Sequence, residues 1–173
     1  GSIATNNPAN NLALALTNSV NKTLALTASN AYQGGTTVWS GNLSVSNNSA
    51  LGTGALTWEK NGSLVALTSL DISNDITVAS GTGTAGLALT ATSKQSLTNK
   101  VSGIISGTGG LRMNTADATA YPANLNNSFE GGFFLQQGTL AVAFVGQAGN
   151  NSPLGISQTI FLGTATNANS SAT

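Results

Sequence analysis

The chain alternates short apolar runs with polar turn residues along most of its length. Residues 12–16 place leucine and alanine at strictly alternating positions, and residues 24–26 repeat that pattern. Similar runs of three to six residues follow at 64–67, 70–72, 76–78 and 87–89. Alternation with a period of two is typical of strands, and runs this short do not support a stable helix. The pattern therefore predicts an all-β chain of many short strands.

Residues 30–57 show this organisation most clearly, as three apolar runs separated by glycine-containing turns. Glycine adopts positive φ angles without steric cost, so it favours the corners between strands. We expect backbone turns at Gly34, Gly35, Gly41 and Gly52. By the same alternation, we expect four aliphatic side chains to point into the core: Val38, Leu43, Val45 and Leu51.

A second copy of this stretch occurs later in the chain. Residues 127–135 repeat residues 30–38 at a distance of 97 positions, and the glycines recur at the same distance. Further on, the distance between matching residues is 103, so the second copy contains an insertion of six residues. The two copies span roughly 24–57 and 121–155. The second copy predicts further structural turns at Gly131, Gly132, Gly138 and Gly155.

Repetition of a short-strand unit favours a solenoid, because each coil buries its apolar side chains against the coils above and below. At roughly 20 to 25 residues per coil, the chain would form about seven or eight coils. Outward Ser, Thr and Asn side chains would then form ladders of like residues along the stack. We interpret residues 1–173 as one β-solenoid domain or a fragment of one. An antiparallel β-sandwich or jelly roll is the alternative, since it also accepts many short strands.

Residues 30–38, together with Gly41, Leu43, Val45 and residues 50–54, resemble the autotransporter-associated β-strand repeat. This family is also called the passenger-associated transport repeat, and it occurs in bacterial surface and secreted proteins. Residues 102–111 resemble the segment that usually precedes the repeat. The resemblance implies a right-handed parallel β-helix (solenoid) within a long exported protein, and it brings no catalytic motif. The second copy departs from the family pattern at Phe129-Glu130 and Phe133-Phe134.

Composition narrows the function further. Charged residues make up 6% of the chain, against about a quarter in average soluble domains, and five basic residues balance five acidic ones. Without a basic surface, nucleic-acid binding is disfavoured. Apolar residues in period-two rows with no net charge also disfavour disorder. The longest apolar run, residues 140–145, is far shorter than the ~20 residues of a membrane helix, so we expect no membrane insertion by this segment.

The sequence offers little for catalysis or metal binding. It contains no histidine and no cysteine, and its basic residues are scattered without a common period. Asp71 and Asp75 form the one close pair of acids, but calcium loops place three or more oxygen donors at alternate positions. We therefore predict a surface turn at this pair, and no catalytic, cofactor or metal site.

Aromatic residues offer the one candidate for ligand contact. Tyr32 and Phe129 recur at the repeat distance, which favours a structural role for both. Trp39 does not recur, and it alternates with the inward Val38, so we expect its indole to face outward. Trp39 is thus the residue predicted to contact a ligand.

These observations favour a non-enzymatic structural or adhesive segment, similar to a stalk, of an exported bacterial surface protein. We expect it outside the cell or on the cell surface, in contact with surface glycans or other cells. One alternative is a self-assembling extracellular fibre subunit, in which copies of the chain join end to end through open strand edges. The other alternative is a carbohydrate-binding module.

Overall fold

The computed structural model describes residues 12–17, 22–60, 62–79, 86–91, 96–157 and 159–163. These residues form strands, turns and bends without a helix, which confirms the predicted all-β class. The strands, in chain order, are β1 (Leu14–Leu16), β2 (Thr23–Leu26), β3 (Thr36–Val38), β4 (Gly41–Val45), β5 (Leu56–Trp58), β6 (Gly62–Ala66), β7 (Leu70–Ile72), β8 (Ile76–Val78), β9 (Gly86–Ala91), β10 (Thr98–Val101), β11 (Ile105–Ser106), β12 (Gly110–Pro122), β13 (Phe133–Leu140) and β14 (Ile160–Leu162).

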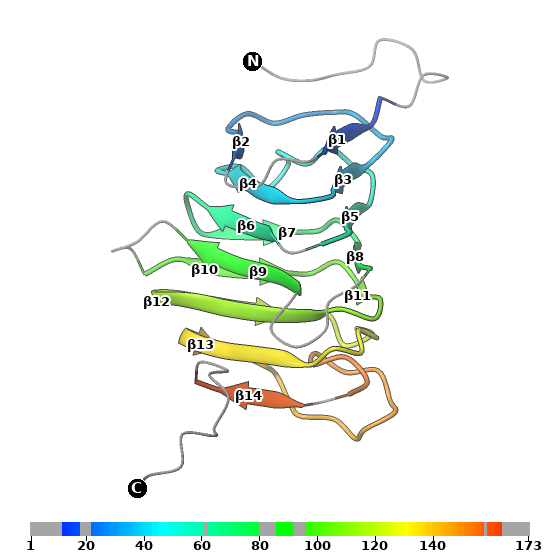
Figure 1. The fold of residues 1–173 in the computed structure, drawn as a ribbon, viewed down its shortest axis with the longest axis vertical. Coiled ribbons are helices and arrows are strands. Elements are labelled where there is room, and N and C mark those ends of the chain that lie inside the picture. The colour runs from blue at the N-terminus through cyan, green and yellow to red at the C-terminus, as the bar shows by residue number, and fades with distance from the viewer. Residues whose placement is uncertain are drawn as a thin grey trace, which may run out of the picture.

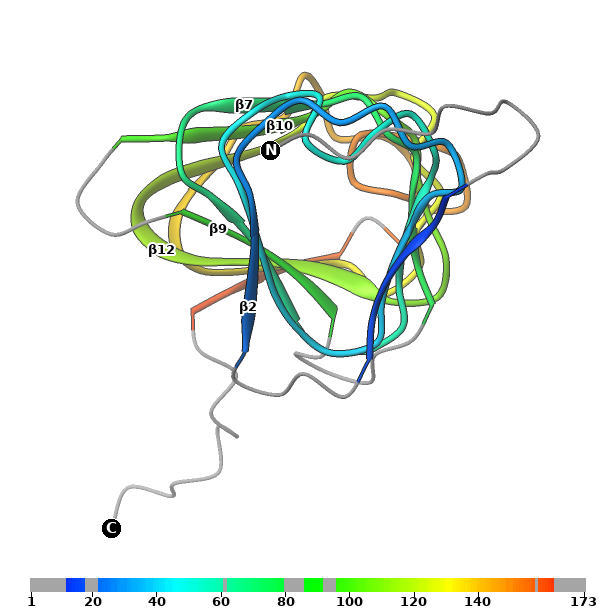
Figure 2. The same ribbon diagram turned by 90° about the horizontal axis from the view of Figure 1, so that it is seen from above.

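Every pairing between these strands is parallel. A five-stranded sheet has the order β1-β3-β5-β8-β11, and a nine-stranded sheet contains β14-β13-β12-β9-β6-β4-β2 together with β7 and β10. Strands next to each other in a sheet lie one coil apart along the chain (Figure 1). Seen from above, the chain runs clockwise from β2 through β3 to β4 while it descends (Figure 2). The fold is therefore a right-handed parallel β-solenoid, as predicted, and the antiparallel sandwich is wrong.

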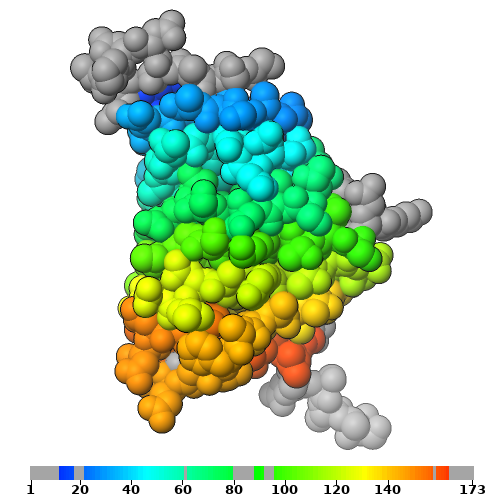
Figure 3. Space-filling model, turned by 180° about the vertical axis from the view of Figure 1, so that it is seen from behind, coloured from blue at the N-terminus to red at the C-terminus, as the bar shows by residue number. Residues whose placement is uncertain are grey.

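The coils differ in length. Thr37 pairs with Thr57 and Thr57 with Thr77, so the first coils take 20 residues each. Thr77 pairs with Ser106, a coil of 29 residues. The described residues consequently form about five complete turns rather than the seven or eight expected from a uniform coil length. The turns lie on one another as bands across the molecule (Figure 3).

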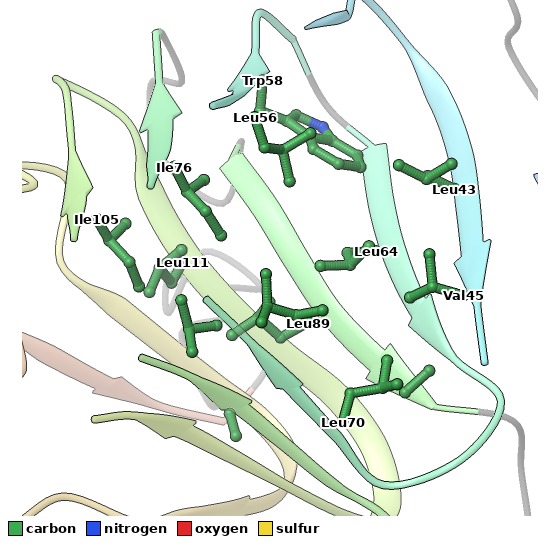
Figure 4. Packing of buried hydrophobic residues seen from close by; sticks show 14 of the residues in the cluster. Leu43, Val45, Leu56, Trp58, Leu64, Leu70, Ile76, Leu89, Ile105 and Leu111 are labelled. Atoms are coloured by element: carbon green, nitrogen blue, oxygen red, sulfur yellow. The ribbon is translucent and has the colours of Figure 1, made fainter. Parts of the chain in front are cut away.

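The core lies between the sheets and consists of rows of like side chains, one from each coil. Leu56, Ile76 and Ile105 form one row, and Leu43, Leu64 and Leu89 form another (Figure 4). All four side chains predicted to point inward from the first repeat copy are completely buried. Because each row continues from coil to coil, burial in one coil depends on its neighbours.

Hydroxyl side chains form the matching outward row on the five-stranded sheet. Thr37, Thr57 and Thr77 are paired residue to residue, and Ser106 continues the row. All four are at least partly exposed. This arrangement confirms the predicted ladder of outward hydroxyl residues, which solvates the surface of a chain with few charges.

The second repeat copy sits at a different place around the coil from the first. Residues 36–38 form a strand of the five-stranded sheet, whereas residues 133–135 pair with β12 in the nine-stranded sheet. In the second copy, the segment before the glycine pair continues the five-stranded face instead, since the N–H groups of Ser128 and Glu130 donate to the carbonyls of Ile105 and Gly107. Sequence identity between the copies therefore preserves a local corner but not its position in the coil.

Candidate functional site

Buried asparagines hold neighbouring coils together at one corner of the solenoid. Asn30 Nδ2 donates to the carbonyl of Ala50 at 2.6 Å, one coil further along the chain. Asn74 Nδ2 donates to the carbonyls of Gly52 and Gly54, at 3.2 and 2.7 Å. Both asparagine side chains are almost fully buried. Because buried carbonyls need donors, these amides satisfy the backbone where the coil turns and no ladder is present.

The second copy builds an equivalent corner. Asn127 Nδ2 donates to the carbonyl of Pro153 at 3.1 Å, and Asn127 Oδ1 accepts the N–H of Ile105 at 2.8 Å. Phe129 takes the place of Tyr32, and both rings are completely buried. The predicted structural role of these two aromatics is confirmed. The role of the asparagines was missed, although their recurrence at the repeat distance was a signal for it.

Tyr32 carries a hydroxyl that Phe129 lacks, and that hydroxyl lies 2.6 Å from Thr36 Oγ1 in a hydrogen bond. Burial raises the pKa of Tyr32, while the bond to Thr36 opposes the rise. The phenol therefore stays neutral at physiological pH, which suits a corner in the core.

The glycines predicted as turns fall into two groups. Six have positive φ angles: Gly35, Gly41, Gly52, Gly132, Gly138 and Gly155. Gly34 and Gly131 are not among the positive-φ glycines, and a Cβ at Gly131 would overlap the backbone of Gly110 in the next coil. Gly138 lies inside β13 rather than between two strands, where the pairing of β13 with β12 shifts register.

Trp39 faces outward and is 46% exposed. It follows β3 directly, and its N–H donates to the carbonyl of Leu16 at 2.8 Å, so the coil fixes its backbone. A hollow of about 260 Å³ beside it is lined by Thr17, Trp39, Ser40 and Lys60. The other aromatics considered in the sequence are buried: Tyr32, Trp58, Phe129, Phe133 and Phe134. Two exposed aromatics, Phe144 and Phe161, were missed by the sequence reasoning.

The two acids of the predicted surface turn make contacts between coils. Asp71 Oδ2 pairs with Lys100 Nζ at 2.6 Å, and Asp71 Oδ1 accepts the hydroxyl of Ser102 at 2.7 Å. Asp75 Oδ1 accepts the N–H of Ile104 at 2.8 Å. Burial opposes ionisation of Asp71, but the bonds from Lys100 and Ser102 outweigh it and lower the pKa of the carboxyl. The hydrogen bond to Asp71 raises the pKa of Lys100.

This cluster is arranged as an ion pair rather than as a nucleophile with its base. A serine nucleophile needs an unprotonated base within hydrogen-bond reach. The Ser102 hydroxyl donates instead to Asp71, whose lowered pKa makes it a weak base, and Lys100 stays protonated. A pair this exposed contributes at most about 1 kcal/mol to stability. In the described part of the chain, no three acidic, histidine or cysteine residues lie close enough together to hold a metal ion.

The described ranges also contain no helix long and apolar enough to cross a membrane.

Comparison with known proteins identifies the repeat. Residues 22–45 and residues 123–142 match the family model of the passenger-associated-transport-repeat. The matches cover β2 to β4 in the first copy, and in the second they run from the segment before Asn127 to just beyond β13. No curated protein and no solved structure matches the chain. The resemblance seen in the sequence is thus confirmed for both copies.

Proposed function

We propose that this chain, which contains two passenger-associated-transport-repeats in a parallel β-solenoid, is a non-enzymatic structural segment of an exported bacterial surface protein. Its task is to extend and stiffen the exported part of that protein. The observation that carries the proposal is the stack of coils itself. Core rows and hydroxyl ladders run along the stack, and the two repeat copies match a family named for passenger transport.

The architecture suits a spacer. Each coil contacts mainly its two neighbours, so length grows by adding coils without rebuilding the core. The amide bonds from Asn30 and Asn74 tie three successive coils together at the corner. A surface of hydroxyls and amides, with few charges, stays solvated independently of pH and ionic strength outside the cell.

Antibody labelling of the source bacterium tests the location. We expect an antibody raised against this segment to label intact cells that produce the full-length protein, while an antibody against a cytoplasmic protein labels them only after permeabilisation. Labelling of the segment only after permeabilisation would contradict export.

A second candidate, end-to-end self-assembly, rests on the last described strand. β14 is the outermost strand of the nine-stranded sheet, with Phe161 44% and Leu162 78% exposed. Phe161 stacks on Phe134, with ring centroids 4.3 Å apart and an interplanar angle of 7°. An open apolar edge is a template for pairing with a strand of another chain, and a lysine on the edge opposes such pairing.

Sedimentation velocity over a range of concentrations tests this association. We expect the isolated chain to form larger species as its concentration rises, and Leu162→Lys to remain monomeric. Leu125→Lys, at another exposed leucine, is the control and should behave like the wild type. A wild-type chain that sediments as a monomer at every concentration would rule the association out.

A further inference from the structure

We propose that the hollow beside Trp39 binds one acidic sugar unit, one that carries a carboxylate. Its four lining residues supply an indole, an ammonium group and two hydroxyls. At about 260 Å³, the hollow is smaller than the roughly 300–1,000 Å³ of sites for drug-sized ligands. It therefore suits a single ring rather than an extended chain of rings.

Trp39 provides the surface on which the ring lies. Its indole leaves 46% of the residue exposed, whereas Trp58, the other tryptophan, is completely buried. Covering an exposed indole with the C–H face of a sugar ring removes apolar surface from water, which is favourable. The bond from the Trp39 N–H to Leu16 holds the backbone of this residue in place, so little order is lost on binding.

Lys60 provides the charge. The ion pair found among the described residues joins Lys100 to Asp71, and Lys60 has no carboxylate partner there. Glu59, its sequence neighbour, does not line the hollow. An ammonium group beside an aromatic surface recognises a sugar carboxylate through a charge-assisted hydrogen bond. The hydroxyls of Thr17 and Ser40 are suited to the hydroxyl groups of the sugar.

The asparagine corner has a hollow of similar size, about 310 Å³, but lacks these two features. Its lining consists of small and amide-bearing residues without a charged or aromatic side chain: Ser29, Asn30, Ala31, Asn48, Ser49, Gly52, Thr53, Ser73 and Asn74. The Trp39 hollow is therefore the site that combines an apolar surface with a charge.

Calorimetric titration with a matched pair of sugars tests the proposal. The probes are trigalacturonic acid and its neutral counterpart, galactotriose. We expect saturable binding of the acidic probe and an affinity at least about tenfold lower for the neutral one. Bound acidic probe should also shield the exposed tryptophan from acrylamide quenching, while the emission of buried Trp58 serves as an internal reference.

Three variants separate the contributions. Trp39→Ala should lower the affinity for trigalacturonic acid by at least about tenfold, and Lys60→Gln should reduce it to that of the neutral probe. Phe144→Ala, at an aromatic that is 45% exposed, is the matched control and should bind like the wild type. Circular dichroism should show all three folded. The proposal is overturned by an absence of saturable binding, by equal affinity for both probes, or by unchanged affinity in either Trp39→Ala or Lys60→Gln.

Discussion

Replacing Gly52 with alanine is expected to destabilise the solenoid by about 3 kcal/mol or more, and to lower its melting temperature by on the order of 10 °C. Gly52 has a φ of +62°, which disfavours any residue with a Cβ. A Cβ there would also overlap the carbonyl oxygen of Tyr32 in the adjacent coil, and backbone cannot move aside as a flexible side chain does. Two coils would have to separate at the asparagine corner.

A matched control separates backbone strain from overlap. Gly149 has a similar φ of +87°, but a Cβ at this position would meet nothing within 4 Å. Gly149→Ala should therefore cost only about 1 kcal/mol, the part due to the left-handed backbone. Chemical denaturation of both variants measures the difference. Equal losses of stability would contradict close packing between the coils at Gly52.

Replacing Trp58 with alanine should destabilise the protein by about 3–5 kcal/mol, the range for removing a large aromatic from a core. Trp58 is completely buried, and its indole lies close to Gly62, where a Cβ would come within 2.8 Å of Nε1. The absence of side chains at Gly41 and Gly62, which are paired, leaves room for the indole within the coil. No side chain nearby can fill the cavity without moving the backbone.

Two further variants show whether the indole itself matters. Trp58 Nε1 is buried without a hydrogen-bond partner. Trp58→Phe removes this unsatisfied donor along with part of the buried area, so it should cost much less than the alanine variant. Trp39→Ala removes an exposed indole and should change the free energy of unfolding by less than about 0.5 kcal/mol. Urea titrations that gave similar losses for Trp58→Ala and Trp39→Ala would contradict the assigned core.

The sequence reveals the strands that alternate strictly and hides those that do not. Alternation of leucine and alanine predicts β1 and β2, and turn glycines predict the corner after Asn30. β12 was missed because Asn114 and Asp117 interrupt its apolar pattern. In the structure these two side chains are exposed, while Met113, Ala118 and Ala120 are buried. A long bent strand needs inward residues only where it faces the core.

Contacts between coils were the hardest feature to foresee, because the coil length varies. Lys100 lies beside Asp71 only because 29 residues separate equivalent positions in these coils. Apolar character was also a poor guide near the end of the chain, since Phe144 and Val145 belong to the longest apolar run and yet are exposed. The exposed position of Trp39 followed from local alternation, but Thr17 and Lys60 join it through the stacking of coils.

Disulfide trapping tests the central claim, the parallel stacking of coils, most directly, since the chain contains no cysteine. Thr57 and Thr77 are paired in adjacent parallel strands, so their Cα atoms lie about 4.8 Å apart, within the range that a disulfide spans. Thr37 and Thr77 lie two coils apart, beyond that range. Under mild oxidation, we expect Thr57→Cys/Thr77→Cys to cross-link within one chain and Thr37→Cys/Thr77→Cys to remain reduced. Failure of the first pair to cross-link, or equal cross-linking of both, would contradict the solenoid.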